Sequence, residues 1–236
     1  MARARSYENL FDAQTRFFQP RRADGSFDRV SDLAAVWMGS GAFTEGSAWH
    51  YRFYAPHDIE GLATLFGGPG PFGDALEQFF SRSALGRPGR VNLLLPDSYY
   101  WHGNEPDLGA AWMFYASSTP ERRFHWVRQI QNRLYTSGPD GLAGNDDGGT
   151  LSAWYLFAAL GLFPVAGTDS YIIGNPILPL AEVTLLDGTT LRIEAPGTGP
   201  EVEGYTGLTV NGEPWTVPTI RHAQLSGATL HFSESP

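Results

Sequence analysis

The sequence predicts a mainly α fold of helical hairpins, followed by a small antiparallel β segment. Apolar residues recur at helical spacing in a series of segments that begin roughly every 25 to 35 residues. From about residue 182 this pattern gives way to short β-like runs separated by turn signals. The helical spacing fits a toroid of helical hairpins whose loops gather at one end. It also fits a helical-repeat solenoid, although no segment repeats another in sequence.

The individual elements follow from local patterns. Ser118 to Glu121 forms a capping box, and the apolar residues after it continue an amphipathic helix to about residue 135. The run after residue 151 is apolar on nearly every face, so we expect a helix that is buried all round. Asp187-Gly188 predicts a hairpin turn near the C-terminus. Helices are expected over residues 7–18, 56–66, 74–83, 108–116, 118–135 and 152–162, and strands over 182–193, 208–212 and 228–232.

Composition excludes several classes of function. The chain has 236 residues, a net charge of −9, no lysine and no cysteine. This balance gives no electrostatic footprint for nucleic acid. Schiff-base and P-loop lysine chemistry, thiolate nucleophiles and cysteine-bound zinc are also excluded. No apolar run is long enough to span a membrane, and the basic start at Met1 to Arg5 is not followed by the apolar region of a signal peptide.

Polar side chains concentrate in three loops at predicted helix boundaries. The loops contain Glu45, the pair Asn104-Glu105, and the run Asn145-Asp146-Asp147, which has glycine on both sides. If the helices form one bundle, all three loops can meet at one end. Separated carboxylates in a chain with 14% aromatic residues suggest glycoside cleavage by an acid and a base. Oxygen ligands without cysteine suggest calcium or another hard cation.

Plainer interpretations of the same residues stay open. The acidic run at 145–147 is also typical of an N-capped surface turn. Glu45 is either an exposed residue near a helix start or a partly buried acid whose pKa is raised by desolvation beside aromatic rings. A zinc site could be built from His50, His57, Asp58 and His102, but their spacing matches no zinc motif.

Several long motifs, in order along nearly the whole chain, resemble glycoside hydrolase family 92, the calcium-dependent inverting α-mannosidases. The motifs that carry the resemblance are Phe43-Thr44-Glu45-Gly46-Ser47-Ala48-Trp49-His50-Tyr51, Pro56-His57-Asp58, Gly103-Asn104-Glu105-Pro106, Gly144-Asn145-Asp146-Asp147 with Ser152-Ala153-Trp154-Tyr155, and Gly161-Leu162-Phe163-Pro164.

The resemblance implies an architecture and a substrate. Members carry an N-terminal β-sandwich followed by an (α/α)6 toroid, with the active site between them. Residues 1–180 would be the back part of that toroid and 181–236 a C-terminal β segment. The missing sandwich, or self-association, would then be needed to cover exposed apolar faces. The implied activity is exo-acting hydrolysis of terminal α-mannosidic bonds in mannose-containing glycans. Relatives are often secreted or periplasmic, but this chain does not identify its compartment.

The resemblance also implies roles for individual residues. Glu45 matches the general acid and Asp147 the general base, with Asn145 or Asp146 as its helper. Substrate contacts are expected from Trp49, His102, Asn104 and Glu105, and Ca²⁺ ligands from Asn104, Glu105 and Asp147. An alternative is that the chain is an inactive carbohydrate-binding or structural remnant of such an enzyme.

The sequence departs from the family pattern at a few positions. Ser47 and His50 stand where asparagine and glutamine are usual, and Trp101-His102 stands where α-1,2-specific members have His-Glu. The second departure puts α-1,2 specificity in doubt.

Overall fold

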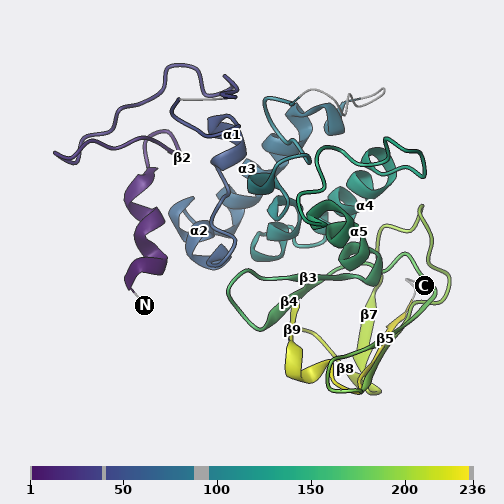
Figure 1. The fold of residues 1–236 in the computed structure, drawn as a ribbon. Coiled ribbons are helices and arrows are strands. Elements are labelled where there is room, and N and C mark those ends of the chain that lie inside the picture. Colours follow the sequence, from purple (N-terminus) through teal and green to yellow (C-terminus); the bar gives the residue numbers. More distant parts are fainter. Residues whose placement is uncertain (1, 39–40, 88–95, 234–236) are drawn as a thin grey trace.

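The computed structural model describes residues 2–38, 41–87 and 96–233, and it has a helical region followed by a β region (Figure 1). The α-helices are α1 (Ala48–Tyr51), α2 (Ile59–Leu65), α3 (Pro69–Arg82), α4 (Arg122–Leu134) and α5 (Thr150–Leu160). The 3-10 helices are η1 (Ala2–Leu10), η2 (Ala84–Gly86), η3 (Glu105–Asp107), η4 (Ala110–Ala116) and η5 (His222–Gln224). Within the described ranges, no helix is both long and apolar enough to cross a membrane.

Aromatic rings fill the core of the helical region. Phe79, Phe80 and Trp112 are fully buried, and the ring of Phe80 stacks on that of Trp126 at a centroid distance of 4.9 Å. α3 supplies both phenylalanines because its apolar residues lie on one face, while α4 and η4 close the core from other sides. Burial of this many large rings is the main stabilising contribution in this region.

The N-terminal segment differs from its predicted helix. Residues 7–10 form the end of η1. Residues 11–18 form a short antiparallel hairpin of β1 (Phe11–Asp12) and β2 (Phe17–Phe18). Phe11 and Phe18 pair across the hairpin, with ring centroids 5.7 Å apart. Cross-strand aromatic packing, which apolar spacing does not reveal, favours the strands here.

The β region forms two sheets besides this hairpin. Their strands are β3 (Leu162–Pro164), β4 (Ser170–Ile173), β5 (Leu180–Thr184), β6 (Thr190–Glu194), β7 (Gly207–Val210), β8 (Glu213–Pro214), β9 (Thr219–Arg221) and β10 (Thr229–Ser233). The larger sheet has the order β5-β6-β10-β7-β8, and the smaller has the order β3-β4-β9.

Two features of these sheets correct the sequence-based expectation. The predicted hairpin at Asp187-Gly188 is present between β5 and β6, but β6 and β10 pair in parallel, so the sheet is mixed and not purely antiparallel. Strands also begin at residue 162 and are a substantial part of the fold.

The division of the chain at residue 180 stays a prediction. In the smaller sheet, β4 lies before that position and its partner β9 lies after it. A second apolar core, with fully buried Ile193 and Leu230, lies in the β region and also includes Leu162 and Ile173. The segment 162–173 therefore contributes to the β region as well as to the helical core.

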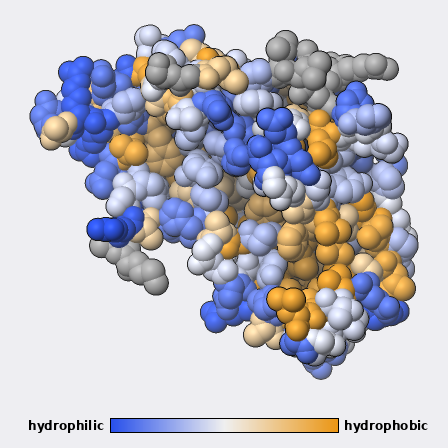
Figure 2. All heavy atoms as spheres, viewed as in Figure 1, coloured by the Kyte–Doolittle hydropathy of each residue, from blue (hydrophilic) through white to orange (hydrophobic). Residues whose placement is uncertain are grey.

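α5 is not buried all round, contrary to the sequence-based prediction. Trp154 and Ala158 are buried, but Leu156 is 58% exposed. Apolar side chains also gather over the β region on the face seen in Figure 2, and Leu178 and Leu180 are among the exposed large apolar residues of the chain. An exposed apolar surface of this kind marks a site of contact with another domain or molecule.

Candidate active site

The Glu45 loop is held in place by the two residues that follow it. The backbone of Gly46 exchanges two hydrogen bonds with Trp37, at 2.9 and 3.0 Å. Ser47 then caps α1, since its hydroxyl oxygen accepts hydrogen bonds from the backbone N–H groups of Trp49 and His50. The His50 ring nitrogen Nδ1 in turn accepts from the Ser47 N–H at 3.0 Å. Ser47 and His50, which both depart from the family pattern, are thus hydrogen-bonded to each other. Glu45 itself is exposed, which favours the first of its two interpretations.

The Asn104 loop contacts the Glu45 loop directly. Asn104 caps η3 by accepting a hydrogen bond from the Glu105 N–H, and its Nδ2 donates to the backbone carbonyl of Glu45 at 2.5 Å. The buried Asn104 side chain therefore fixes the backbone at Glu45, while the Glu105 side chain is exposed.

The loop of residues 144–149 contacts the Asn104 loop through two glycines. A Cβ atom on Gly144 would lie 2.8 Å from the Cα of Gly103, and one on Gly103 would lie 2.5 Å from the carbonyl oxygen of Ala143. Only glycine allows the backbones to approach so closely. The Glu45 loop and the loop of residues 144–149 therefore each contact residues 103–105, which lie between them.

The close approach of the two glycines gives a testable prediction. Gly144→Ala forces the loops apart, so we expect a loss of about 1–3 kcal/mol in the free energy of unfolding. Thermal and chemical unfolding would measure it. Gly199→Ala is the matched control, because a Cβ there meets no atom within 4 Å. Equal stability of the two variants would contradict the contact.

Asp146 and Asp147 have different surroundings although they are adjacent. The carboxylate of Asp146 accepts hydrogen bonds from the Ser152 N–H at 2.9 Å and from the Ser152 hydroxyl at 2.7 Å. These bonds lower the pKa of Asp146, the hydroxyl contributing most. In the described part of the chain, the carboxylate of Asp147 accepts no such bond and is exposed, as is the side chain of Asn145. Asp146 therefore anchors the loop to α5, and Asp147 presents a free carboxylate.

Both predicted catalytic carboxylates are on strained backbone. Four non-glycine residues in the described ranges have positive φ: Arg16, Glu45 at 49°, Asp147 at 41°, and Asn211. Asn211 precedes Gly212 in a tight turn, where such values are expected. For glutamate the left-handed conformation costs roughly 1–2 kcal/mol, and aspartate tolerates it somewhat better. Backbone strain of this kind clusters at functional sites.

Trp49 and His102 are core residues in this structure. The Trp49 ring packs against Phe17 and Tyr99, each at a centroid distance of 5.0 Å. The ring nitrogens of His102 bond to the hydroxyls of Tyr100 and Tyr135 at 2.5 and 2.6 Å. Burial lowers the pKa of His102 to about 3, so the ring is neutral. Since both side chains lie below the surface, a direct contact of either with a ligand stays a prediction.

The buried His102 connects the second and third loops. Tyr135 donates a hydrogen bond to the Leu151 carbonyl at the start of α5 as well as contacting His102. Burial raises the pKa of Tyr135, and the negative charge of Asp146 adds to the shift. The row of Tyr100, His102 and Tyr135 thus connects the Asn104 loop to the start of α5.

The zinc alternative finds no support in the described ranges. No three His, Asp or Glu side chains there are placed to hold one metal ion. His50 bonds to the Asp97 carbonyl, and His57 bonds to the Ala4 carbonyl. The three histidines of that hypothesis therefore each have separate backbone or tyrosine partners.

Sequence reasoning missed two residues of this site. Asp107 is fully buried, and burial raises its pKa well above the usual range. Its Oδ2 accepts a hydrogen bond from the Trp101 N–H at 2.8 Å, which fixes the start of the Asn104 loop. Tyr51 donates to the carbonyl of Thr44 at 2.7 Å. Burial contributes most to raising the pKa of Tyr51, followed by Tyr54 and then by the charges of Glu45 and Glu105.

Comparison with known proteins identifies the family. Residues 1–235 match the model of the glycosyl hydrolase family 92 catalytic domain, and the chain belongs to this family. An α-mannosidase of the family from Bacteroides thetaiotaomicron superimposes with a TM-score of 0.86 at 31% identity, covering 100% of this chain and 30% of that one. An inverting mannosidase of the family from B. thetaiotaomicron VPI-5482 gives 0.82 at 27% identity, covering 100% and 33%.

A curated relative agrees with this assignment. An uncharacterized secreted glycosidase from Arthroderma benhamiae is 26% identical over 255 residues, which cover 98% of this chain and 31% of that protein. The chain thus spans about a third of the length of the relatives that it matches.

Proposed function

We propose that this chain supplies the general acid and the general base of an exo-acting, inverting α-mannosidase. The observation that carries the proposal is the joining of the Glu45 and Asp147 loops across Gly103 and Asn104, with both carboxylates exposed on strained backbone. Membership of the family and the likeness to mannosidases support the choice of substrate, a terminal α-mannoside of a mannose-containing glycan.

In the proposed reaction, protonated Glu45 donates its proton to the glycosidic oxygen as the bond from that oxygen to C1 breaks. A water molecule forms the new bond to C1 from the opposite face and loses a proton to the Asp147 carboxylate. The products are mannose of inverted configuration and the free alcohol. This mechanism requires roughly 6.5–9.5 Å between the two carboxyl groups, to leave room for the water.

In this proposal, neighbouring residues hold the acid and the base in position. Asn104 holds the backbone of Glu45, and Asp146 holds the loop that carries Asp147 through Ser152. Asn145, exposed on the same loop, is available as a second helper. Glu105 is the exposed group of the middle loop and is the candidate for a direct contact with sugar hydroxyls.

The proposal includes a calcium ion held by exposed carboxylates. The carboxylates of Glu105 and Asp147 offer the oxygen atoms that Ca²⁺ prefers. The Asn104 side chain is already engaged as a cap, and the described residues hold no cluster of three acidic or histidine side chains for one ion. The assignment of Asn104, Glu105 and Asp147 as ligands stays a prediction, and an ion held there would orient the hydroxyl groups of the sugar.

Dependence on calcium is expected to be directly measurable. Activity of the full-length gene product on an α-mannoside should fall to background after chelation and return when Ca²⁺, but not Mg²⁺, is added. Isothermal titration of the chelated protein with Ca²⁺ gives a second readout that is independent of turnover. Full activity in the presence of chelator would contradict a role for the ion.

A covering domain is also part of the proposal. The exposed face of α5 at Leu156 and the apolar surface of the β region suit contact with a β-sandwich domain or a second copy of the chain. Because a curated relative is described as secreted, we extend the proposal to an exported protein.

A panel of α-mannosides with and without calcium tests the proposal against the alternative of an inactive remnant. Hydrolysis with release of β-mannose, observed by NMR, would support the inverting enzyme. Binding of mannosides without hydrolysis by the full-length gene product would favour the remnant.

A further inference from the structure

Three arginine residues lie together on the helical region. Arg16 lies in the turn between β1 and β2, Arg52 directly follows α1, and Arg82 is the last residue of α3. These elements meet because the Trp49 ring of α1 packs against phenylalanine rings of β2 and α3 (Figure 1). The Cζ atoms of Arg52 and Arg82 lie 4.8 and 5.3 Å from the centre of the Trp49 ring. Two guanidinium groups therefore contact one indole ring.

Arg52 is the buried member of this arginine cluster. It is 5% exposed, and its Cζ lies 4.3 Å from the centre of the Phe17 ring. Its Nε donates to the Arg16 carbonyl at 3.1 Å, and its Nη1 donates to Oε1 of Gln78 at 3.4 Å. Among the described residues its Nη2 has no hydrogen-bond partner, yet this atom is not fully enclosed. Arg52 therefore has one donor group that a small ligand can reach.

Among the described residues, no carboxylate balances the charge of this cluster. The exposed side chains of Arg16 and Arg82 form no hydrogen bond or ion pair within those ranges. Burial, and after it the charges of Arg16 and Arg82, lower the pKa of Arg52 to about 10. Asp12 precedes Arg16 by four residues, but its carboxylate is already paired with Arg29 at 2.5 Å. Like charges are thus held together in a chain whose net charge is −9, an arrangement that a bound anion would stabilise.

The backbone of Arg16 is a further sign that its side chain is needed at this place. Its φ is 57°, in the left-handed region that favours glycine. Of the four non-glycine residues with positive φ in the described ranges, it alone belongs neither to the proposed catalytic pair nor to the Asn211-Gly212 turn. A glycine would form the β1–β2 turn at lower cost, so the turn itself does not explain the arginine.

We propose that Arg16, Arg52 and Arg82 form a binding site for a phosphate group, either as the free ion or as the ester group of a sugar phosphate. Guanidinium groups match phosphate oxygens with pairs of parallel hydrogen bonds. The exposed Arg16 and Arg82 can turn toward the ion, and Nη2 of Arg52 donates to it from the base of the site. The inference does not depend on the proposed hydrolysis, because neither Glu45 nor Asp147 is among the charges that act on Arg52.

Isothermal titration of the full-length gene product with inorganic phosphate, at constant ionic strength, tests the site. Arg16→Gln and Arg82→Gln each remove one charge from an exposed side chain, so both variants should fold normally, which circular dichroism would verify. We expect each to raise the Kd for phosphate about tenfold or more, the usual effect of losing a charge-assisted hydrogen bond. Arg3→Gln is the matched control, since Arg3 is exposed outside the cluster, and its Kd should stay within about twofold of the unmodified protein.

Glucose 6-phosphate and glucose distinguish the two sources of the phosphate group. Glucose is used because mannose could also bind at the proposed active site. Tighter binding of glucose 6-phosphate than of inorganic phosphate, with no binding of glucose, would support a sugar phosphate as the ligand. Equal Kd values for the two phosphates would support the free ion. In both cases, Arg16→Gln and Arg82→Gln should weaken binding.

Three results would overturn the inference. If the unmodified protein binds no phosphate up to roughly 10 mM, the cluster is not a phosphate site. If Arg16→Gln and Arg82→Gln bind phosphate as tightly as the unmodified protein, the ion binds elsewhere. If Arg3→Gln loses as much affinity as the two cluster variants, the attraction is a general effect of positive charge. None of these results bears on the proposed hydrolysis.

Discussion

Glu45→Gln in the full-length gene product is expected to lower kcat/KM for an α-mannobiose by roughly 10²–10⁴-fold, the usual contribution of a positioned general acid. Glutamine keeps the size of the side chain and the backbone, but it cannot donate a proton and then hold the charge. The bond to a sugar alcohol breaks slowly without that proton. Fluoride leaves without protonation, so hydrolysis of α-mannosyl fluoride should be far less affected.

The contrast between the two substrates identifies the role of Glu45 more sharply than loss of activity alone. A residue that only positions the sugar would affect both substrates to a similar degree. Glu213→Gln is the matched control, because Glu213 is exposed and lies in β8, in the β region. An equal loss on fluoride and mannobiose, or full activity on both, would remove Glu45 from the role of acid.

The helices and turns that the sequence predicted correctly are those with a strong local signal. α4 follows from a regular apolar face, although the predicted capping box at Ser118 to Glu121 does not form, because the N-cap is Glu121 and makes no side-chain cap hydrogen bond. The β5–β6 hairpin follows from Asp187-Gly188. The pairings of β4 with β9 and of β6 with β10 join strands far apart in the chain. Nothing in a local pattern determines which distant edge a strand will meet, so these pairings were not predictable.

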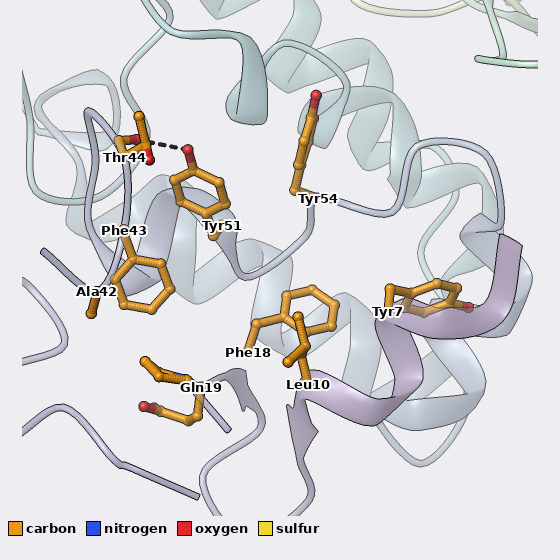
Figure 3. A pocket seen from close by; sticks show the side chains of 10 residues that line it. Tyr7, Leu10, Phe18, Gln19, Ala42, Phe43, Thr44, Tyr51 and Tyr54 are labelled. Carbon is orange, nitrogen blue, oxygen red and sulfur yellow. Dashed lines mark hydrogen bonds between the residues drawn. The ribbon is translucent and has the colours of Figure 1, made fainter. Parts of the chain in front are cut away.

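Some features of the candidate site could likewise be predicted from local sequence, and others could not. Glycines beside acidic residues indicated the loops of Glu45, Asn104 and Asp147, and the close contact of Gly103 with Gly144 explains why glycine is needed at two of these positions. The resemblance predicts ligand contacts for Trp49 and His102, but a local pattern does not reveal burial, and the structure places both side chains in the core. An aromatic cavity lined by Phe18, Phe43 and Tyr51, among others, was not predictable (Figure 3), because its wall forms only when residues 7–20 fold against residues 42–54.

Asp147→Asn is expected to abolish hydrolysis of both substrates, with a loss of roughly 10²–10⁴-fold in kcat/KM. The base activates water whatever the leaving group is, so fluoride should not be spared as it is in Glu45→Gln. Azide, which needs no base, should restore turnover of the fluoride in this variant and give the β-mannosyl azide. Asp140→Asn is the matched control, since Asp140 is exposed a few residues earlier in the chain.

Asp147→Gly separates the chemical role of this residue from its effect on stability. Glycine adopts the positive φ of 41° without the steric cost that aspartate has. We therefore expect Tm to stay the same or rise, by an amount worth at most about 1 kcal/mol, although activity is lost. A backbone that is strained only to present a carboxylate gains stability when that carboxylate is removed. A clear fall in Tm would mean instead that the Asp147 side chain holds the loop together, and its assignment as the base would then lose the support of the strained backbone.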